Sequence, residues 1–170
     1  MEEERTYNKI QVVDENDNPL GAMSYHEAID KGCIRRASRV YVFNQSGKIL
    51  IQRRSKHISK PMLFDGSAAG HVDEGETYAE AAARELKEEL GISGYELTLI
   101  EHARRTTHFF SDTYKVVVPD NVVVDIDSHE VHDFLWMSVT EIDSLVIERK
   151  DECHVPFVEV WSNLKDKLIQ

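Results

Sequence analysis

The most informative stretch of the chain is GHVDEGETYAEAAARELKEELGI, residues 70–92. Thr77 and Glu80 have the spacing of a capping box, in which the two side chains satisfy the first free N–H groups of a helix. The run that follows is rich in Ala, Leu and Glu, which favour helix. Gly91 is a residue type that commonly ends helices. The stretch therefore predicts a loop followed by a helix from Thr77 to Leu90.

Three glutamates lie close together on this predicted helix. At about 100° per residue, Glu88 lies about 60° behind Glu85, and Glu89 lies about 40° ahead of it. The three carboxylates thus share an arc of about 100°. The apolar residues are centred about 125° away, and they are Ala79, Ala82, Ala83, Leu86 and Leu90. We therefore expect one face of the helix to pack and an adjacent face to concentrate negative charge.

Concentrated negative charge has two physical interpretations. Like charges three or four residues apart on a helix repel each other, and a divalent cation would reverse that repulsion. Carboxylate oxygens suit Mg²⁺ or Mn²⁺, and Mg²⁺ commonly takes one or two carboxylates together with substrate phosphates and water. The alternative is a solvated acidic face that binds nothing, which is the usual role of a charged helix face.

The spacing of the stretch resembles the Nudix box, G-x5-E-x7-R-E-U-x-E-E-x-G-U, where U is aliphatic. Every defined position matches, and these positions are Gly70, Glu76, Arg84, Glu85, Leu86, Glu88, Glu89, Gly91 and Ile92. The resemblance implies an α/β fold of the Nudix type, an α/β/α sandwich with a mixed central sheet. It also implies a strand–loop–helix catalytic unit.

The resemblance further implies a role for each residue of the box. Glu85, Glu88 and Glu89 would hold Mg²⁺ or Mn²⁺, helped by the carbonyl of Gly70. Arg84 would act with them by orienting the glutamates. Two more residues would have structural roles, and these are Glu76 and Gly91.

The implied reaction is the attack of water on phosphorus in a nucleoside diphosphate derivative or a related small diphosphate. A metal ion would offset charge on the phosphoryl oxygens and lower the pKa of bound water. The general base stays open: it is either a box glutamate or Glu130, which follows Ser128 and His129 in a later loop.

Basic residues outside the box are candidates for binding substrate phosphates. One cluster comprises Arg53, Arg54, Lys56 and Lys60. Arg104 and Arg105, with His108, form another. Of these residues, Arg54, Lys56, Lys60 and Arg104 are our candidate substrate contacts. The alternative is that these charges are simply solvated on the surface.

A second resemblance, to isopentenyl diphosphate isomerases, lies mostly outside the box. It rests on CIRRASRVYVFNQSGKILIQRRS at 33–55, AAGHVDEGE at 68–76 and HEVHDFLWM at 129–137. Ala69 stands where the isomerases carry a catalytic Cys before Gly-His, and Arg35 stands where they carry a His. Alanine cannot move a proton, so hydrolysis is favoured over isomerisation. A third alternative is a non-catalytic binding module, although such relatives usually lose box glutamates.

Length and composition limit the remaining possibilities. The chain has 170 residues, which suits one domain, and we place it at residues 6–170. The net charge of −11 disfavours binding to nucleic acid polymers or anionic membranes. Cys33 and Cys153 form no CxxC pair, which fits a reducing cytoplasm. The expected partner is a small-molecule diphosphate, and a homodimer is an open alternative because family members are often dimers.

Periodicity and turn signals predict the other elements. The expected strands lie at about 9–13, 39–43, 48–54, 67–72, 95–105, 113–118 and 133–139, and further helices at 24–31, from Thr140, and at 155–168.

Overall fold

The structure is a computed structural model that describes residues 9–170, so the predicted domain start at residue 6 lies outside the described residues. Its strands are β1 (Ile10–Val13), β2 (Pro19–Met23), β3 (Ile34–Asn44), β4 (Ile49–Arg54), β5 (Phe64–Asp65), β6 (Ala68–His71), β7 (Thr98–Arg105), β8 (Phe109–Val118) and β9 (Val131–Met137). Its helices are α1 (Tyr25–Asp30), α2 (Tyr78–Leu90), α3 (Val139–Glu148), a 3₁₀ turn (Lys150–Glu152) and α4 (Val155–Leu168). In this part of the chain, every helix is too short or too polar to cross a membrane.

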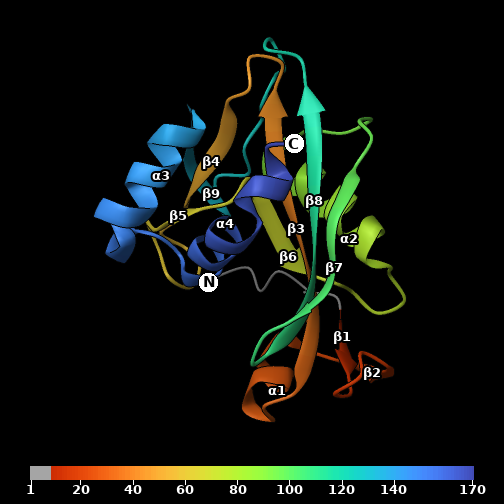
Figure 1. The fold of residues 1–170 in the computed structure, drawn as a ribbon. Coiled ribbons are helices and arrows are strands. Elements are labelled where there is room, and N and C mark those ends of the chain that lie inside the picture. The colour runs from red at the N-terminus through yellow and green to blue at the C-terminus, as the bar shows by residue number, and fades with distance from the viewer. Residues whose placement is uncertain (1–8) are drawn as a thin grey trace.

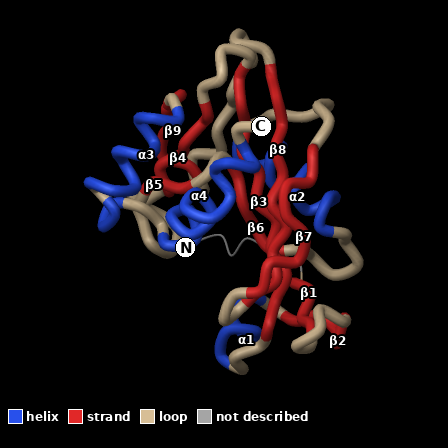
Figure 2. Tube along the Cα trace, in the orientation of Figure 1, coloured by secondary structure: helices blue, strands red, loops and turns tan. Residues whose placement is uncertain are grey.

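Strand β3 is the centre of a mixed sheet (Figure 2). It pairs in parallel with β8 along residues 35–44 and antiparallel with β6 and β1. It meets β4 only at Phe43 and Ile49, because β4 then turns away to pair with β5 and β9. The sheet therefore splits between β6 and β4.

The two faces of the sheet are covered by different helices (Figure 1). Val40 and Val42 of β3 belong to a buried cluster that includes α2. Tyr41 and Phe43 belong to a second cluster that includes α3 and α4. This alternation follows from the two-residue period of a strand. The predicted α/β/α sandwich with a mixed sheet is confirmed.

Helix α2 has the predicted ends but a different buried face. Its capping box between Thr77 and Glu80 is complete, and Gly91 ends it with φ of 67°. Ala79 and Ala83, which we expected to pack, are exposed, while six others on the helix are buried: Tyr78, Ala81, Ala82, Leu86, Glu89 and Leu90. Hydropathy does not distinguish one Ala from another, so the larger Tyr78 and Leu86 set which face packs.

Other differences lie where the local signal is weak. Strands β2 and β5 were not predicted, and β8 begins at Phe109 instead of Thr113. Helix α3 begins after Ser138 instead of Thr140, because Ser138 and Glu141 form the capping box. The predicted last helix, α4, agrees at both ends.

The capping box of α2 leads to a first prediction. Thr77→Ala should lower the free energy of unfolding by about 1 kcal/mol, because the N–H of Glu80 loses its acceptor. Thr77→Ser keeps the hydroxyl and should stay close to the wild type. Urea denaturation followed by circular dichroism measures both. Equal stability of the two variants would show that the cap contributes nothing.

Candidate active site

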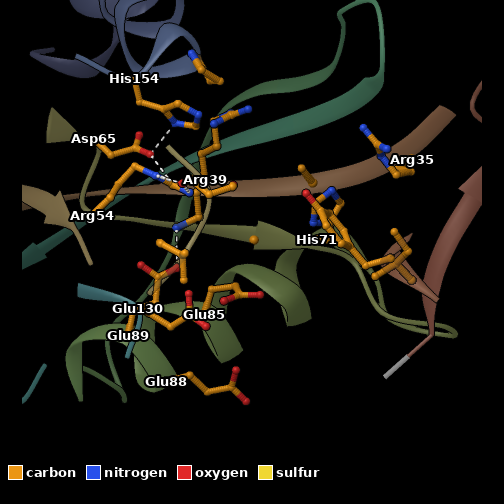
Figure 3. A pocket seen from close by; sticks show the side chains of 18 of the residues that line it. Arg35, Arg39, Arg54, Asp65, His71, Glu85, Glu88, Glu89, Glu130 and His154 are labelled. Atoms are coloured by element: carbon orange, nitrogen blue, oxygen red, sulfur yellow. Dashed lines mark hydrogen bonds and ion pairs between the residues drawn. The ribbon is translucent and has the colours of Figure 1, made fainter. Parts of the chain in front are cut away.

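A cavity of about 680 Å³ lies where the sheet splits. Residues of β3, β4, β5, β6 and α2 line it, together with His154 and Pro156 at the start of α4. Figure 3 shows four acids, Glu85, Glu88, Glu89 and Glu130, gathered at one side, with Arg39 and Arg54 across from them. The cavity therefore has an acidic wall and a basic wall.

Glu89 is the most buried of the acids, with 6% of its surface exposed. One carboxylate oxygen accepts a hydrogen bond from Gln52 Nε2 at 2.7 Å, and the other accepts one from the backbone N–H of Ala69 at 3.2 Å. A strand on each side of the split therefore holds this carboxylate in place.

Glu85 lies directly against Gly70 of β6. A Cβ atom added at Gly70 would overlap the Glu85 carboxylate. Only glycine lets the helix and the strand approach so closely with this carboxylate between them. The close approach explains why the pattern requires glycine at position 70.

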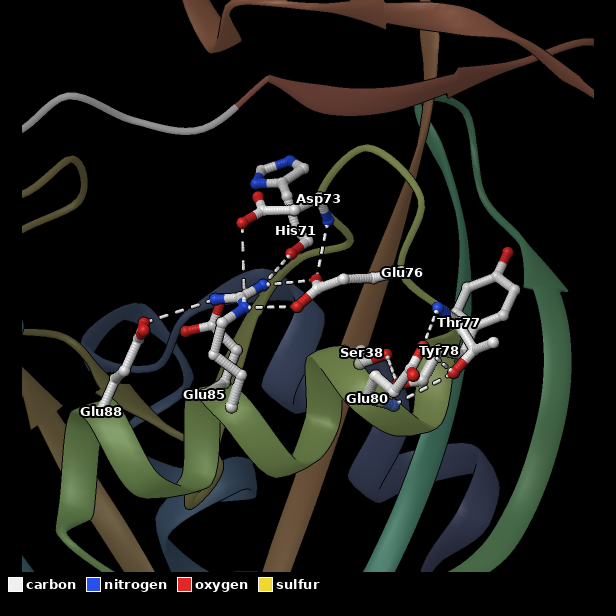
Figure 4. A network of polar contacts seen from close by, with 10 residues as sticks. Ser38, His71, Asp73, Glu76, Thr77, Tyr78, Glu80, Glu85 and Glu88 are labelled. Carbon is white, nitrogen blue, oxygen red and sulfur yellow. Dashed lines mark hydrogen bonds and ion pairs between the residues drawn. The ribbon is translucent and has the colours of Figure 1, made fainter.

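Arg84 joins the loop, strand β6 and helix α2, and Figure 4 labels its partners Glu76, Glu85, Glu88 and His71. Its guanidinium donates to both carboxylate oxygens of Glu76, at 2.8 and 2.9 Å. It also donates to Glu85 Oε1 at 2.7 Å and to the carbonyl of His71 at 2.9 Å. A longer contact of 3.3 Å reaches Glu88, whose side chain is half exposed. These contacts connect the loop, the strand and the helix through one guanidinium, and the orienting role of Arg84 and the bracing role of Glu76 remain predictions.

The acidic wall has more negative charge than its neighbours offset. Burial, with a smaller effect from the charges of Glu88 and Glu130, raises the pKa of Glu85 to about 7 against the opposing effect of Arg84. Burial and the charge of Glu85 also raise the pKa of Glu89 well above its usual value. An added cation would stabilise both carboxylates in their ionised form.

This donor set fits a hard divalent cation. The carboxylates project to one side of α2, and the Gly70 backbone lies beside Glu85. Within residues 9–170, three or more acidic, His or Cys side chains nowhere form a ready-made coordination cluster. Mg²⁺ does not need one, since one or two carboxylates with phosphate oxygens and water suffice.

The basic wall contains a buried ion-pair network. Asp65 on β5 pairs with Arg54 Nη1 at 3.1 Å and with His154 Nδ1 at 2.6 Å. Burial opposes ionisation of Asp65, but the hydrogen bond and charge of His154, followed by the charges of Arg54 and Arg39, hold its pKa below the usual value. The start of α4 is thereby tied to the cavity.

The structure brings only some of the predicted residues together. All box glutamates that were expected to bind metal line the cavity with Gly70 and Arg84, and Glu130 lies among them. Of the candidate substrate contacts, Arg54 lines the cavity, whereas Lys56, Lys60 and Arg104 do not. Arg104 instead pairs with Glu101 on its own strand.

The cavity residues that were not among our candidates include Arg35, Arg39, Gln52 and His154. The sequence does contain a pattern that involves Arg35 and Arg39. They lie four residues apart, so in a strand their side chains share one face. The run IRRASRVYVF contains three arginines, but the sequence does not say which of them face a cavity.

The cavity has no thiol among its lining residues. Ala69 stands before Gly70, and its N–H is used by Glu89. Cys153 is buried near α3, and Cys33 lies beside Met23. The cavity therefore lacks the cysteine that the isomerase resemblance would place at position 69.

Comparison with known proteins identifies the class. The family model for the NUDIX domain matches residues 34–160. The chain belongs to the Nudix family, whose hydrolases act on pyrophosphate bonds.

Three relatives illustrate the similarity. An uncharacterized Nudix hydrolase of Pseudomonas aeruginosa, PA4841, is 44% identical over 103 residues, which cover 59% of this chain and 56% of that protein. Isopentenyl-diphosphate Delta-isomerase 1 of Mesocricetus auratus is 31% identical over 161 residues, which cover 79% of this chain and 71% of that protein. The crystal structure of DR0079 from Deinococcus radiodurans has the same fold, with a TM-score of 0.79 at 22% identity. The match covers 92% of this chain and 99% of that chain.

The raised pKa of Glu85 leads to a prediction about metal-free protein. An acid whose pKa is raised by folding favours the native state below its unfolded value and loses that contribution as pH rises through its folded value. For Glu85 this interval runs from its ordinary value of 4.5 to about 7. Glu85→Gln should therefore be more stable than the wild type at pH 8, by on the order of 2–3 kcal/mol, and the difference should shrink toward pH 5.

Urea denaturation in EDTA at several pH values measures this difference. Parallel stability curves for the wild type and Glu85→Gln would contradict the assigned charge excess. A matched series in Mg²⁺ should show the opposite order at pH 8, because the wild type then gains ligand binding energy.

Proposed function

We propose that this protein is a Mg²⁺- or Mn²⁺-dependent hydrolase that cleaves a diphosphate linkage by attack of water on phosphorus. The observation that carries the proposal is the acidic wall itself. Glu89 is buried and Glu85 is only 14% exposed at its side chain, and both line a cavity in which Arg84, Gln52 and a backbone N–H hold them. A carboxylate group that served only as a solvated helix face would not be buried in this way.

The chain's own residues would have distinct roles. Glu85, Glu88 and Glu89, with the carbonyl of Gly70, would hold the cation. When bound, the cation would offset phosphoryl charge and lower the pKa of water. Arg84 keeps Glu85 oriented toward the cavity. Glu130, which lies among the acids, is the residue we assign to accept the proton from water.

The proposed substrate is a nucleoside diphosphate derivative or a related small diphosphate. A cavity of about 680 Å³ falls within the range that holds a small organic ligand. Its basic wall offers positive charge for phosphates that the cation does not contact.

A substrate screen tests the proposed reaction. The protein should release phosphate or nucleotide from at least one member of a diphosphate library when Mg²⁺ is present, and EDTA should abolish that release. Activity that survives EDTA, or no activity across the library with either cation, would contradict the proposal.

Variants of the acidic wall test the residue roles. Glu88→Gln should lower kcat by roughly 100-fold or more, since it removes a proposed metal ligand without removing core packing. Glu74→Gln is the control, because Glu74 is exposed in the preceding loop and does not line the cavity. Near-normal turnover of Glu88→Gln would refute the assigned role.

Isomerisation of isopentenyl diphosphate is the second candidate, because isomerases are among the relatives. The absence of a cysteine from the lining residues argues against it. We expect no conversion of isopentenyl to dimethylallyl diphosphate, measured by separation of the two products. Conversion at a rate comparable with any hydrolysis found in the screen would reverse our preference.

A further inference from the structure

Arg35 and Arg39 are buried cations whose guanidinium groups have no ion pair and no side-chain hydrogen bond in the described part of the chain. They are 7% and 9% exposed, and the Nε atom of each is buried without a hydrogen-bond acceptor. Across residues 9–170, neither guanidinium forms an ion pair or a side-chain hydrogen bond, whereas Arg36 pairs with Asp17 and Arg54 with Asp65. The two arginines therefore differ from their neighbours in having no ion-paired acid among the described residues, and Asp65, whose charge Arg39 feels, is already paired with Arg54 and His154.

Both side chains belong to the cavity. Residues 35, 37 and 39 share one face of β3, and all three line the cavity. Arg39 is paired in register with Ala69, the residue whose N–H binds Glu89. Arg39 therefore lies near the acidic wall, and Figure 3 shows Arg35 farther along β3, beside His71.

The end of the cavity around Arg35 is built from rings. The guanidinium carbon of Arg35 lies 5.2 Å from the ring centre of Phe109. The ring of His71 lies 5.2 Å from that of Tyr25 and 6.2 Å from that of Phe109. The Nε2 atom of His71 is also buried without a partner. The Phe109 ring thus contacts the guanidinium of Arg35, whose buried Nε has no hydrogen-bond acceptor within residues 9–170.

Two unpaired buried cations are costly for a fold. Burying a charge without an ion pair or a hydrogen bond destabilises a protein. Within residues 9–170, replacing either arginine by a neutral side chain would break no ion pair and no side-chain hydrogen bond. An anion from outside would remove that cost, and a guanidinium fork matches phosphate oxygens.

We propose that Arg35 and Arg39 form an anion subsite that binds a phosphate group of the substrate beyond the linkage that is cleaved. The inference rests on the proposed function, because it takes the acidic wall as the place of cleavage. It limits the proposed substrates to molecules that carry one more phosphate group than the cleaved diphosphate, such as nucleoside triphosphates. Arg39 would lie nearer the cleaved linkage, and Arg35 would lie nearer the end of the cavity formed by the rings.

Binding without metal tests the subsite independently of catalysis. Isothermal titration calorimetry in EDTA with inorganic tripolyphosphate should give binding to the wild type. Arg35→Gln and Arg39→Gln should each weaken it by about 10- to 100-fold, as expected for loss of a charge-assisted hydrogen bond. Lys48→Gln removes the same charge from the exposed turn after β3 and should bind like the wild type. Equal affinity of all four proteins would overturn the subsite.

Stability shows whether the arginines serve the fold instead. Melting temperatures of Arg35→Gln and Arg39→Gln should equal or exceed that of the wild type without ligand, since each variant removes an unpaired buried charge. A drop of many degrees in both would indicate a structural role and overturn the inference. Arg35→Lys, which keeps the charge and loses the fork, should fold and show intermediate tripolyphosphate affinity.

Kinetics separate this inference from the proposed function. With Mg²⁺, Arg35→Gln should raise KM about 10-fold or more for a nucleoside triphosphate and change it little for ADP-ribose, which has no terminal phosphate. Equal KM changes for both would overturn the subsite while leaving hydrolysis established. Absence of all hydrolysis by the wild type would instead count against the proposed function, and the calorimetric result would still stand.

Discussion

The close packing of α2 on β6 is the constraint on which the site depends. Gly70 has no side chain, so the Glu85 carboxylate fits against the strand. Arg84 then bonds Glu76, Glu85 and the carbonyl of His71 with one guanidinium. Because the Arg84 guanidinium contacts the loop, the strand and the helix, it sets the positions of Glu76 and Glu85 relative to the strand. Loss of any one of these contacts would therefore move the carboxylates.

The split in the sheet turns this local unit into a cavity. Glu85 and Glu89 come from helix α2, which packs on one face of the sheet. Arg39 lies on the other face of β3, the face that α3 and α4 cover. If β4 continued to pair with β3 beyond Phe43, the strands would close the gap. The diverging strand therefore lets acidic and basic groups from the two faces of one sheet meet across the same space, which is how a polyanion and a cation could be bound together.

Agreement between sequence and structure is best where the signal is local. The ends of α2 and α4 follow from capping residues and helical spacing a few residues long. Strands β2 and β5 are short, and their pairing partners lie elsewhere in the chain, so no local pattern marks them. The face of α2 that packs was also misassigned at Ala79 and Ala83, since small residues are compatible with burial or exposure.

The box, its helix and the common arc of the three glutamates can be predicted from residue order, because they depend on spacing along one continuous segment. The burial of Glu89 and the half-exposed position of Glu88 depend instead on how α2 packs in the folded protein. Folding also brings Arg35 and Arg39 to the cavity and leaves other basic residues outside, namely Lys56, Lys60 and Arg104. The physical reason is that burial and charge pairing arise from contacts between segments distant in the chain, which spacing within a segment does not specify.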